Sequence, residues 1–309
     1  MTDIRMALGT IPFGTRLADD DSFALLDRFV AAGGTRIDTA NNYPFWVEGA
    51  TGDESELAIG RWLAARRNRD DVVLSTKCGG RPALPGDTTM ASAEGLSEAV
   101  IRDAAEGSLR RLGTDRIDVY WSHVEDRTTP LEEQVRAFGA LVTRGAVREL
   151  GASNHATWRL DRARQIALAA GLQPYTHVQL RYTYLQPRPG VRLPEPGHTL
   201  VTVETLDYVA AERLTLWAYN TLMFGAYTRP DRPINEIYDH PGSTRRLAVL
   251  HEVAGELGAT ANQVVLAWLV AHGVVPIVGV TRTDQLDEAL AGVQLQLKPQ
   301  VLARLDEAA

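Results

Sequence analysis

The chain has 309 residues, of which 45% are hydrophobic and 23% are charged, and this balance is the ordinary one for a globular protein. It excludes a disordered chain, a collagen and a disulfide-rich miniprotein, and the net charge of −7 argues against a broad nucleic-acid-binding surface. The single cysteine, Cys78, cannot form an internal disulfide. The start of the chain lacks a signal-peptide pattern, and the longest apolar run, Val264–Ala271, is too short to span a membrane. We therefore expect a cytoplasmic protein with no membrane or nucleic-acid partner.

Short apolar runs alternate with amphipathic segments along nearly the whole chain. Strands are expected, in chain order, at Met6–Gly9 (a weaker run), Arg36–Thr39, Val72–Thr76, Ile117–Ser122, Val147–Ala152, His177–Leu180, Leu214–Tyr219 and Val274–Val280. Helices are expected at Asp21–Ala32, Glu54–Arg66, Ser97–Arg111, Leu131–Arg144, Trp158–Ala170 and Gln263–Ala271, with Pro130 suited to a first helical position. Strands that alternate with helices indicate a parallel sheet.

Two architectures compete for this pattern, a closed (β/α)₈ barrel and an open doubly wound sheet. The count of eight strands and the lack of a G-x-G-x-x-G motif after the first strand favour a TIM barrel that covers residues 1–309 as one domain. Long loops are expected after the second, sixth and seventh strands. The sixth includes the Pro-rich stretch Gln186–Gly197 and the seventh spans Thr221–Gly242, and long loops in compact domains tend to be functional.

Polar residues stand where consecutive predicted strands end, which is where barrel enzymes place their catalytic groups. Asp38, Lys77 and His123 end three such strands, and Tyr43 follows Asp38 in the same loop. Adjacent strands lie about 4.8 Å apart, so these side chains can converge. A lysine ammonium would lower the pKa of a neighbouring tyrosine, an aspartate would hold the lysine, and a histidine would bind a substrate oxygen. Each residue alone could be structural, as an ion pair, a satisfied histidine or a packing aromatic, but the four together predict protonation of a carbonyl that receives a hydride.

At these residues the sequence resembles the aldo-keto reductase family, and the resemblance runs nearly end to end. It rests on Leu8–Thr10 with Phe13–Gly14, Ile37–Tyr43, Ser75–Lys77, Ile117–His123, Leu150–Asn154, Val178–Tyr182 and Pro276–Thr281. The resemblance implies a (β/α)₈ barrel that binds NADPH without a Rossmann fold and reduces aldehydes or ketones. It further implies that Asp38, Tyr43, Lys77 and His123 form the catalytic tetrad, with Tyr43 as the proton donor.

The same resemblance implies a set of cofactor contacts. Ser153, Asn154 and Gln179 would hold the nicotinamide carboxamide, and Tyr219 would stack on the nicotinamide ring. The pyrophosphate and adenosine would be bound by Asn220, Leu222 and Gly225 of the seventh loop and by Gly279, Thr281, Arg282 and Gln285 of the eighth. The structural alternatives are a helix cap at Ser153–Asn154, a barrel-filling polar residue at Gln179 and a core aromatic at Tyr219.

The chain departs from the family pattern at three points. A longer aromatic segment follows Tyr43 where the family commonly has Tyr-Gly, Asn220–Thr221 replaces Ser-Pro, and Ala289 stands where an Asn near the adenine is frequent. NADPH is favoured over NADH because Arg282, at a helix start, has no evident partner in the sequence and could bind the 2′-phosphate. Asp284 opposes this interpretation, since a carboxylate repels phosphate.

The predicted substrate pocket is lined by aromatic residues from several loops. These are Phe45, Trp46, Trp121, Tyr182 and Tyr184. They suit a fairly large, partly apolar carbonyl compound, and a keto-sugar is also compatible with them. The competing functions are a Schiff-base lyase that uses Lys77 as its nucleophile and a non-catalytic NADPH-binding regulator. No metal is expected, because no H-E-x-x-H motif occurs, and the sequence does not indicate an oligomeric state.

Overall fold

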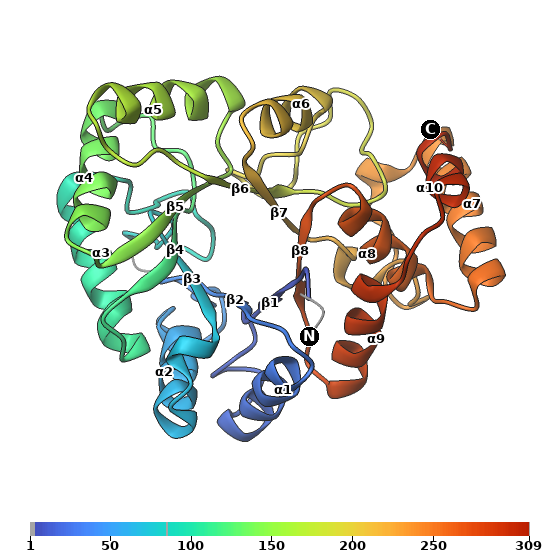
Figure 1. Cartoon of the computed structure of the whole chain (residues 1–309), viewed down its shortest axis with the longest axis horizontal. Helices are drawn as coiled ribbons and strands as arrows, with labels where there is room; N and C mark the ends of the chain where they lie inside the picture. Colours follow the sequence, from blue (N-terminus) through green and yellow to red (C-terminus); the bar gives the residue numbers. More distant parts are fainter. Residues whose placement is uncertain (1–3, 85, 309) are drawn as a thin grey trace.

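The computed structural model describes residues 4–84 and 86–308 and forms a closed barrel of parallel strands surrounded by helices (Figure 1). The strands pair in sequence order and β8 closes the barrel against β1. They are β1 Ala7–Gly9, β2 Arg36–Asp38, β3 Val73–Cys78, β4 Ile117–Ser122, β5 Val147–Ser153, β6 His177–Arg181, β7 Thr215–Tyr219 and β8 Val275–Gly279. The prediction of a (β/α)₈ barrel is therefore confirmed, and every predicted strand lies within two residues of its observed bounds.

The helices form the outer layer of the barrel. They are α1 Asp19–Ala31, α2 Glu54–Arg66, α3 Glu98–Leu112, α4 Leu131–Thr143, α5 Thr157–Ala169, α6 Val203–Ala211, α7 Pro241–Leu257, α8 Ala261–Ala271, α9 Thr283–Gln294 and α10 Pro299–Asp306. Short 3₁₀ helices occur at Arg69–Asp71, Met223–Gly225 and Glu236–Tyr238. The last helix, α10, packs on α7 at one side of the barrel (Figure 1).

Side-chain caps define several helix starts. Ser97 accepts a hydrogen bond from the backbone at the start of α3, and Thr202 and Thr260 form capping boxes at α6 and α8. The sequence suggests that Pro130 occupies the first helical position of α4. It is instead the N-cap of that helix, one residue earlier. Gly113 ends α3 with φ of 61°, a left-handed conformation that glycine adopts without steric cost.

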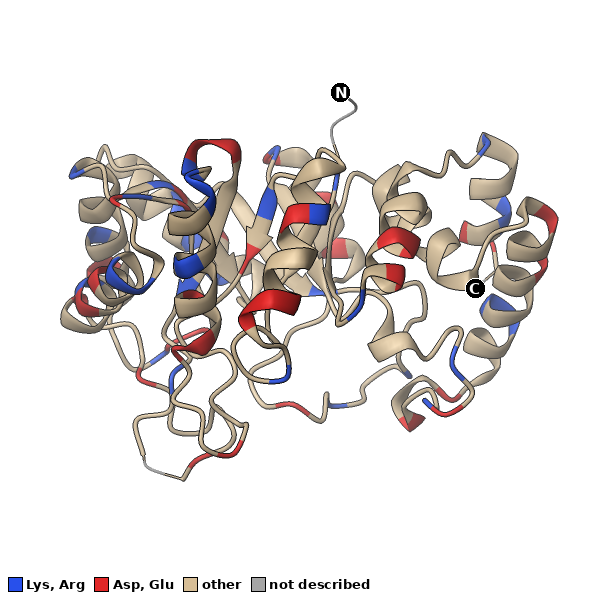
Figure 2. Cartoon of the chain, turned by 90° about the horizontal axis from the view of Figure 1, so that it is seen from below, with Lys and Arg blue, Asp and Glu red and all other residues tan. Residues whose placement is uncertain are grey.

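Long loops follow the strands at one end of the barrel, the lower side of Figure 2. The expected loops after β2, β6 and β7 span residues 39–53, 182–202 and 220–240. A further long loop, between Cys78 and Glu98, follows β3 and was not expected. In the described part of the chain no single helix is long and apolar enough to span a membrane. The segments α7 and α8 meet that criterion only when taken together, across a bend of 99°.

A small apolar cluster fills the barrel interior and includes Trp121, which is fully buried. Its ring packs edge-on against Trp217, with centroids 5.4 Å apart, and it lies over Gly151. A Cβ at Gly151 would come within 2.1 Å of the Trp121 ring, so only glycine leaves room for it. Trp121 therefore forms part of the barrel core, and its assignment to the substrate pocket is wrong.

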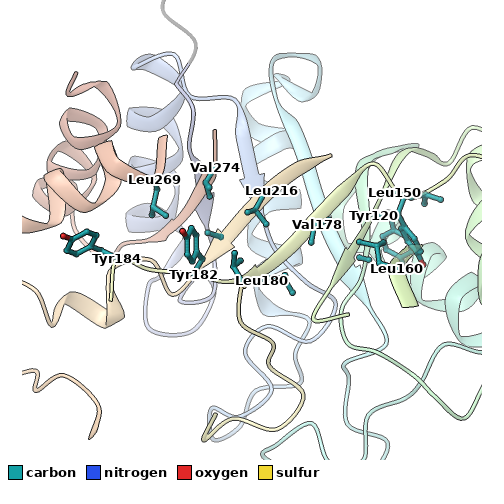
Figure 3. Packing of buried hydrophobic residues seen from close by; sticks show 14 of the residues in the cluster. Tyr120, Leu150, Leu160, Val178, Leu180, Tyr182, Tyr184, Leu216, Leu269 and Val274 are labelled. Atoms are coloured by element: carbon teal, nitrogen blue, oxygen red, sulfur yellow. The ribbon is translucent and has the colours of Figure 1, made fainter. Parts of the chain in front are cut away.

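Tyr182 and Tyr184 belong to the larger cluster between the strands and the helices (Figure 3). Both rings contact Trp268 of α8, at centroid distances of 5.6 and 5.3 Å. The Tyr184 hydroxyl donates a hydrogen bond to the Leu305 carbonyl at 2.9 Å. Because both side chains pack outside the barrel wall, the prediction that they line the substrate pocket is also wrong.

Candidate active site

A buried ion pair lies at the carboxyl ends of β2 and β3. Lys77 Nζ donates to Asp38 Oδ2 at 2.6 Å and to the Thr39 carbonyl at 2.6 Å. The side chains of Lys77 and Asp38 are 0% and 4% exposed. Asp38 Oδ1 also accepts hydrogen bonds from Ser75 Oγ at 2.7 Å and from Gln179 Nε2 at 3.2 Å. The lysine is thus held as predicted, and Gln179 joins the pair from β6.

Tyr43 lies against this ion pair. Lys77 Nζ is 4.8 Å from the centroid of the Tyr43 ring, and His123 packs edge-on against the same ring at 5.7 Å. Burial raises the pKa of Tyr43 well above its usual value, and the carboxylate of Asp38 raises it further. We expected the opposite direction from the sequence. The expectation was wrong because burial of the phenol dominates and the positive charge of Lys77 is paired with Asp38.

His123 directly follows β4 and is neutral. Burial lowers its pKa well below the usual value, and the positive charge of Lys77 adds to the shift. Its Nδ1 is buried beside Gly80 and has no hydrogen-bond partner among the described residues. A neutral imidazole keeps one N–H, which can be donated to a carbonyl oxygen.

The loop that carries Tyr43 is fastened to the loop after β3. The Arg81 guanidinium donates hydrogen bonds to the carbonyls of Asn41 and Thr51 and forms an ion pair with Asp53. These contacts hold both sides of the loop that begins at Asn41. Sequence reasoning missed Arg81, because nothing in the local pattern indicates which loop it contacts.

Two aromatic residues after Tyr43 extend the site. Trp46 is 40% exposed and packs edge-on against Tyr43, with centroids 6.1 Å apart. Phe45 packs edge-on against Trp46 at 5.0 Å. The structure thus brings both predicted pocket residues to the side of the tyrosine ring, where they form an apolar border.

Asn154 connects four segments at the mouth of the barrel. Its Nδ2 donates to the His123 carbonyl at 3.0 Å and to Ser153 Oγ at 3.1 Å. Its Oδ1 accepts from the Thr199 backbone at 3.1 Å and from the Tyr219 hydroxyl at 2.7 Å. Its backbone has φ of 60°, and α5 begins after a separate N-cap, so Asn154 is not a helix cap. A contact between its amide and a carboxamide would have to replace one of these bonds.

The three predicted cofactor-binding residues of the loop after β7 lie in different environments. The Asn220 amide, oriented so that its oxygen faces Arg181, accepts from Nε at 3.0 Å and from Nη2 at 2.8 Å. Leu222 is half-buried and packs between the two outer core clusters. Gly225 has φ of 91° and lies beside Arg229. Asn220 is therefore engaged with a neighbouring strand, whereas Gly225 lies next to a cation.

In the loop after β8, Arg282 has a partner. Its guanidinium donates two hydrogen bonds, each 2.9 Å long, to the carboxylate of Asp284. The expectation that Arg282 is unpaired was wrong, although the pair is well exposed. Thr281 donates through its backbone and its hydroxyl to Gln285 Oε1, at 2.9 and 3.2 Å. Gly279 is exposed at the end of β8.

Sequence reasoning also missed Arg229, which the loop after β7 places near Arg282. Hydrogen bonds with Asp231 raise the pKa of Arg229, and the positive charge of Arg282 opposes this shift. Both arginines are exposed, and each pairs with an exposed aspartate two residues later. Water and salt screen exposed pairs of this kind, so each contact is weak and either arginine can exchange its aspartate for another anion. Within the described ranges, no three His, Cys, Asp or Glu side chains are grouped to hold a metal ion.

The sequence was compared with known families and with curated proteins, and both comparisons give the same family. The Aldo/keto reductase family matches residues 5–309. An uncharacterized oxidoreductase of Bacillus subtilis (strain 168), YrpG, is 31% identical over 98% of this chain and 91% of its own length. Norsolorinic acid reductase stcV of Emericella nidulans is 30% identical (98% and 77%), and an aryl-alcohol dehydrogenase of Pestalotiopsis microspora is 28% identical (93% and 72%). The chain belongs to the aldo/keto reductase family of NAD(P)H-dependent oxidoreductases.

Proposed function

We propose that this protein reduces an aldehyde or ketone to the alcohol with NADPH, and that Tyr43 donates the proton. The observation that carries the proposal is the position of Lys77, which Asp38 holds with its Nζ 4.8 Å from the centroid of the Tyr43 ring. A carbonyl oxygen bound beside this ring would meet the Tyr43 hydroxyl and the neutral His123. The nicotinamide supplies the hydride when it is bound.

The raised pKa of Tyr43 sets the order of proton transfer. The phenol remains protonated at neutral pH and gives up its proton only to a strong base. A carbonyl oxygen is a weak base, but it becomes a strong one as its carbon receives a hydride. The ammonium of Lys77 then stabilises the phenolate that is left behind, which is general acid catalysis with electrostatic support.

Residues at the barrel mouth fit a nicotinamide nucleotide. Tyr219 is half-buried and offers a ring face, and Ser153 at the end of β5 pairs in register with Gln179 of β6. At Gly279 a Cβ would meet only a backbone oxygen of Gly9, at 3.7 Å, so a ligand can approach the backbone there. The start of α9 follows, and its first backbone N–H groups suit an anion.

The preference for NADPH rests on Arg229 and Arg282. Both guanidinium groups lie near the start of α9 and can bind the 2′-phosphate that NADH lacks. Binding would exchange their weak contacts with Asp231 and Asp284 for contacts with a doubly charged group. Two arginines would therefore face the negative charge of the 2′-phosphate, whereas the sequence pointed to Arg282 alone.

The substrate class is proposed from the aromatic border of Phe45 and Trp46. An exposed indole edge beside the reacting tyrosine suits a flat, partly apolar carbonyl compound. The relative named an aryl-alcohol dehydrogenase supports an aromatic substrate. The cytoplasmic location expected from the sequence stays a prediction.

Replacing Tyr43 with Phe tests the function. We expect kcat to fall by about 10²–10⁴-fold while the Kd for NADPH stays nearly unchanged, because only the hydroxyl is lost. The matched control is Tyr182→Phe, which removes a hydroxyl outside the barrel. If Tyr43→Phe keeps more than about a tenth of kcat, the proton comes from another group.

The alternatives from the sequence have less support. Burial lowers the pKa of Lys77, as a nucleophilic amine would need, but its Nζ is inaccessible and hydrogen-bonded to Asp38 and Thr39. Borohydride trapping of a carbonyl substrate on Lys77 would favour the lyase. A regulator that binds NADPH without turnover would show cofactor binding and no reduction of any carbonyl in a broad panel.

A further inference from the structure

The Pro-rich loop after β6 is fastened over the mouth of the barrel. Thr199 donates through its backbone and its hydroxyl to Asn154, at 3.1 and 3.3 Å. Its carbonyl accepts from the Arg181 backbone at 3.0 Å, and the Val201 backbone donates back to Arg181 at 3.1 Å. An ion pair between Arg181 and Glu195 fixes the other side of the segment. Contacts with Asn154 after β5 and with Arg181 of β6 therefore fix the position of residues 195–201.

This fastening places His198 beside the reacting groups. Its ring packs edge-on against Tyr219, with centroids 5.1 Å apart. His198 lies within electrostatic reach of His123, whose pKa is lowered mainly by burial. Tyr219 in turn lies within electrostatic reach of Tyr43, although burial is the main cause of its raised pKa. His198 thus shares the barrel mouth with both groups that would face a substrate carbonyl.

The hydrogen-bonding capacity of His198 is unused. Burial lowers its pKa, so the ring is neutral. Nδ1 is buried and lies 3.9 Å from Glu195 Oε2, too far for a hydrogen bond but close enough to favour the tautomer with its proton on Nδ1. Nε2 is then an acceptor, and no described residue donates to it. The His198 side chain is 23% exposed, and Nδ1 is its sealed nitrogen, so Nε2 is the ring nitrogen that faces the open side of the imidazole.

We propose that His198 Nε2 accepts a hydrogen bond from a hydroxyl of the substrate, so that the enzyme prefers carbonyl compounds that carry a hydroxyl near the carbonyl. The inference rests on the proposed carbonyl reduction, and it narrows the substrate class. Tyr219 holds the imidazole on one side and the fastened loop holds its backbone. The acceptor is therefore in place before a substrate binds, and little side-chain freedom is lost on binding.

The test compares benzaldehyde, the three hydroxybenzaldehydes and their methoxy counterparts as substrates. Any intrinsic difference between a hydroxylated substrate and its methoxy counterpart is the same in every protein tested, whereas only the hydroxyl can donate to His198. The variant is His198→Phe, which keeps a ring against Tyr219 and removes the acceptor. The matched control is His251→Phe on the exposed side of α7. The kcat/KM values and the Kd for NADPH are measured for all three proteins.

We expect the best hydroxylated substrate to lose three- to tenfold in kcat/KM relative to its methoxy counterpart in His198→Phe, which is roughly the worth of one neutral hydrogen bond. The control, the Kd for NADPH and the values for benzaldehyde should stay within about twofold. An unchanged hydroxyl-to-methoxy ratio in His198→Phe overturns the inference while carbonyl reduction stands. So does a parallel loss of NADPH affinity, because His198 would then serve the cofactor. A wild type that binds NADPH but reduces none of the aldehydes overturns both proposals.

Discussion

Replacing Lys77 with Met should separate the structural role of this residue from its catalytic role. The Lys77–Asp38 pair is the most deeply buried ion pair in the described chain, with side chains 0% and 4% exposed. Methionine fills a similar volume, but it leaves the Asp38 carboxylate with only Ser75 and Gln179 as side-chain donors. Removing one partner of a buried pair costs about 3–5 kcal/mol, because the other charge stays buried without compensation.

The double variant Asp38→Asn/Lys77→Met tests this explanation of the cost. It removes both charges, and an asparagine can still accept a hydrogen bond from Ser75. We therefore expect the double variant to lose less than about 2 kcal/mol of unfolding free energy, which is less than the single variant loses. Its activity should not recover, because Tyr43 still lacks the neighbouring cation, and kcat should be down by at least about 10²-fold in both variants.

Both quantities can be measured on the same preparations. Urea unfolding followed by fluorescence of the buried tryptophans gives the free energy of unfolding, and NADPH oxidation with an aldehyde gives kcat. Two results would refute the reasoning. If the double variant loses as much unfolding free energy as Lys77→Met or more, the uncompensated Asp38 carboxylate is not the source of the cost. If the double variant regains activity, the positive charge of Lys77 does not assist Tyr43.

Further predictions concern the pH profile, the substrate border and the cofactor. Because burial raises the pKa of Tyr43, its acid form persists well above pH 7, so kcat/KM should stay flat within about twofold from pH 7 to about 9.5; a decline that starts near pH 8 would show a lowered pKa instead. Trp46→Ala should change the ranking of small and bulky carbonyls by kcat/KM with little change in NADPH affinity, and an unaltered ranking would mean that the indole only packs the loop. Arg229→Ala and Arg282→Ala should each weaken NADPH binding about tenfold and leave NADH binding unchanged. An NADPH preference that survives both substitutions would contradict the assignment of these arginines.

The fold and the convergence of Asp38, Lys77 and His123 could be predicted because both depend on strand positions. Eight apolar runs alternating with helices leave few architectures open, and each strand fixes the residue at its carboxyl end. Asp38, Lys77 and His123 stand at such ends and converge as expected. The sequence could not show the environment of Tyr43, since its pKa depends on burial that the packed loops create.

The wrong pocket residues show what a strand-end rule leaves out. Side chains along a strand alternate between the two faces of the barrel wall. Gln179 and Asp38 meet inside the barrel, so Tyr182, three residues after Gln179, falls outside. Trp121 does face inward, but it lies two residues before His123 and so fills a deeper layer. Strand parity alone would have removed Tyr182 from the predicted pocket, and the position of Trp121 two residues before the strand end would have removed Trp121.

Tyr43 differs from the other three polar residues because no strand holds it. Its loop is positioned by Arg81, which bonds to the carbonyls of Asn41 and Thr51, so a residue of the loop after β3 determines where the proposed proton donor lies relative to Lys77. On the opposite side of the mouth, Asn154 performs the same task for the loop after β6. Reacting groups must be held within about 0.5 Å of a productive geometry, and a barrel wall alone sets only the strand ends. The polar residues that fasten the loops are therefore as necessary to the site as the residues that touch a substrate, and local sequence patterns do not reveal them because their partners lie in other loops.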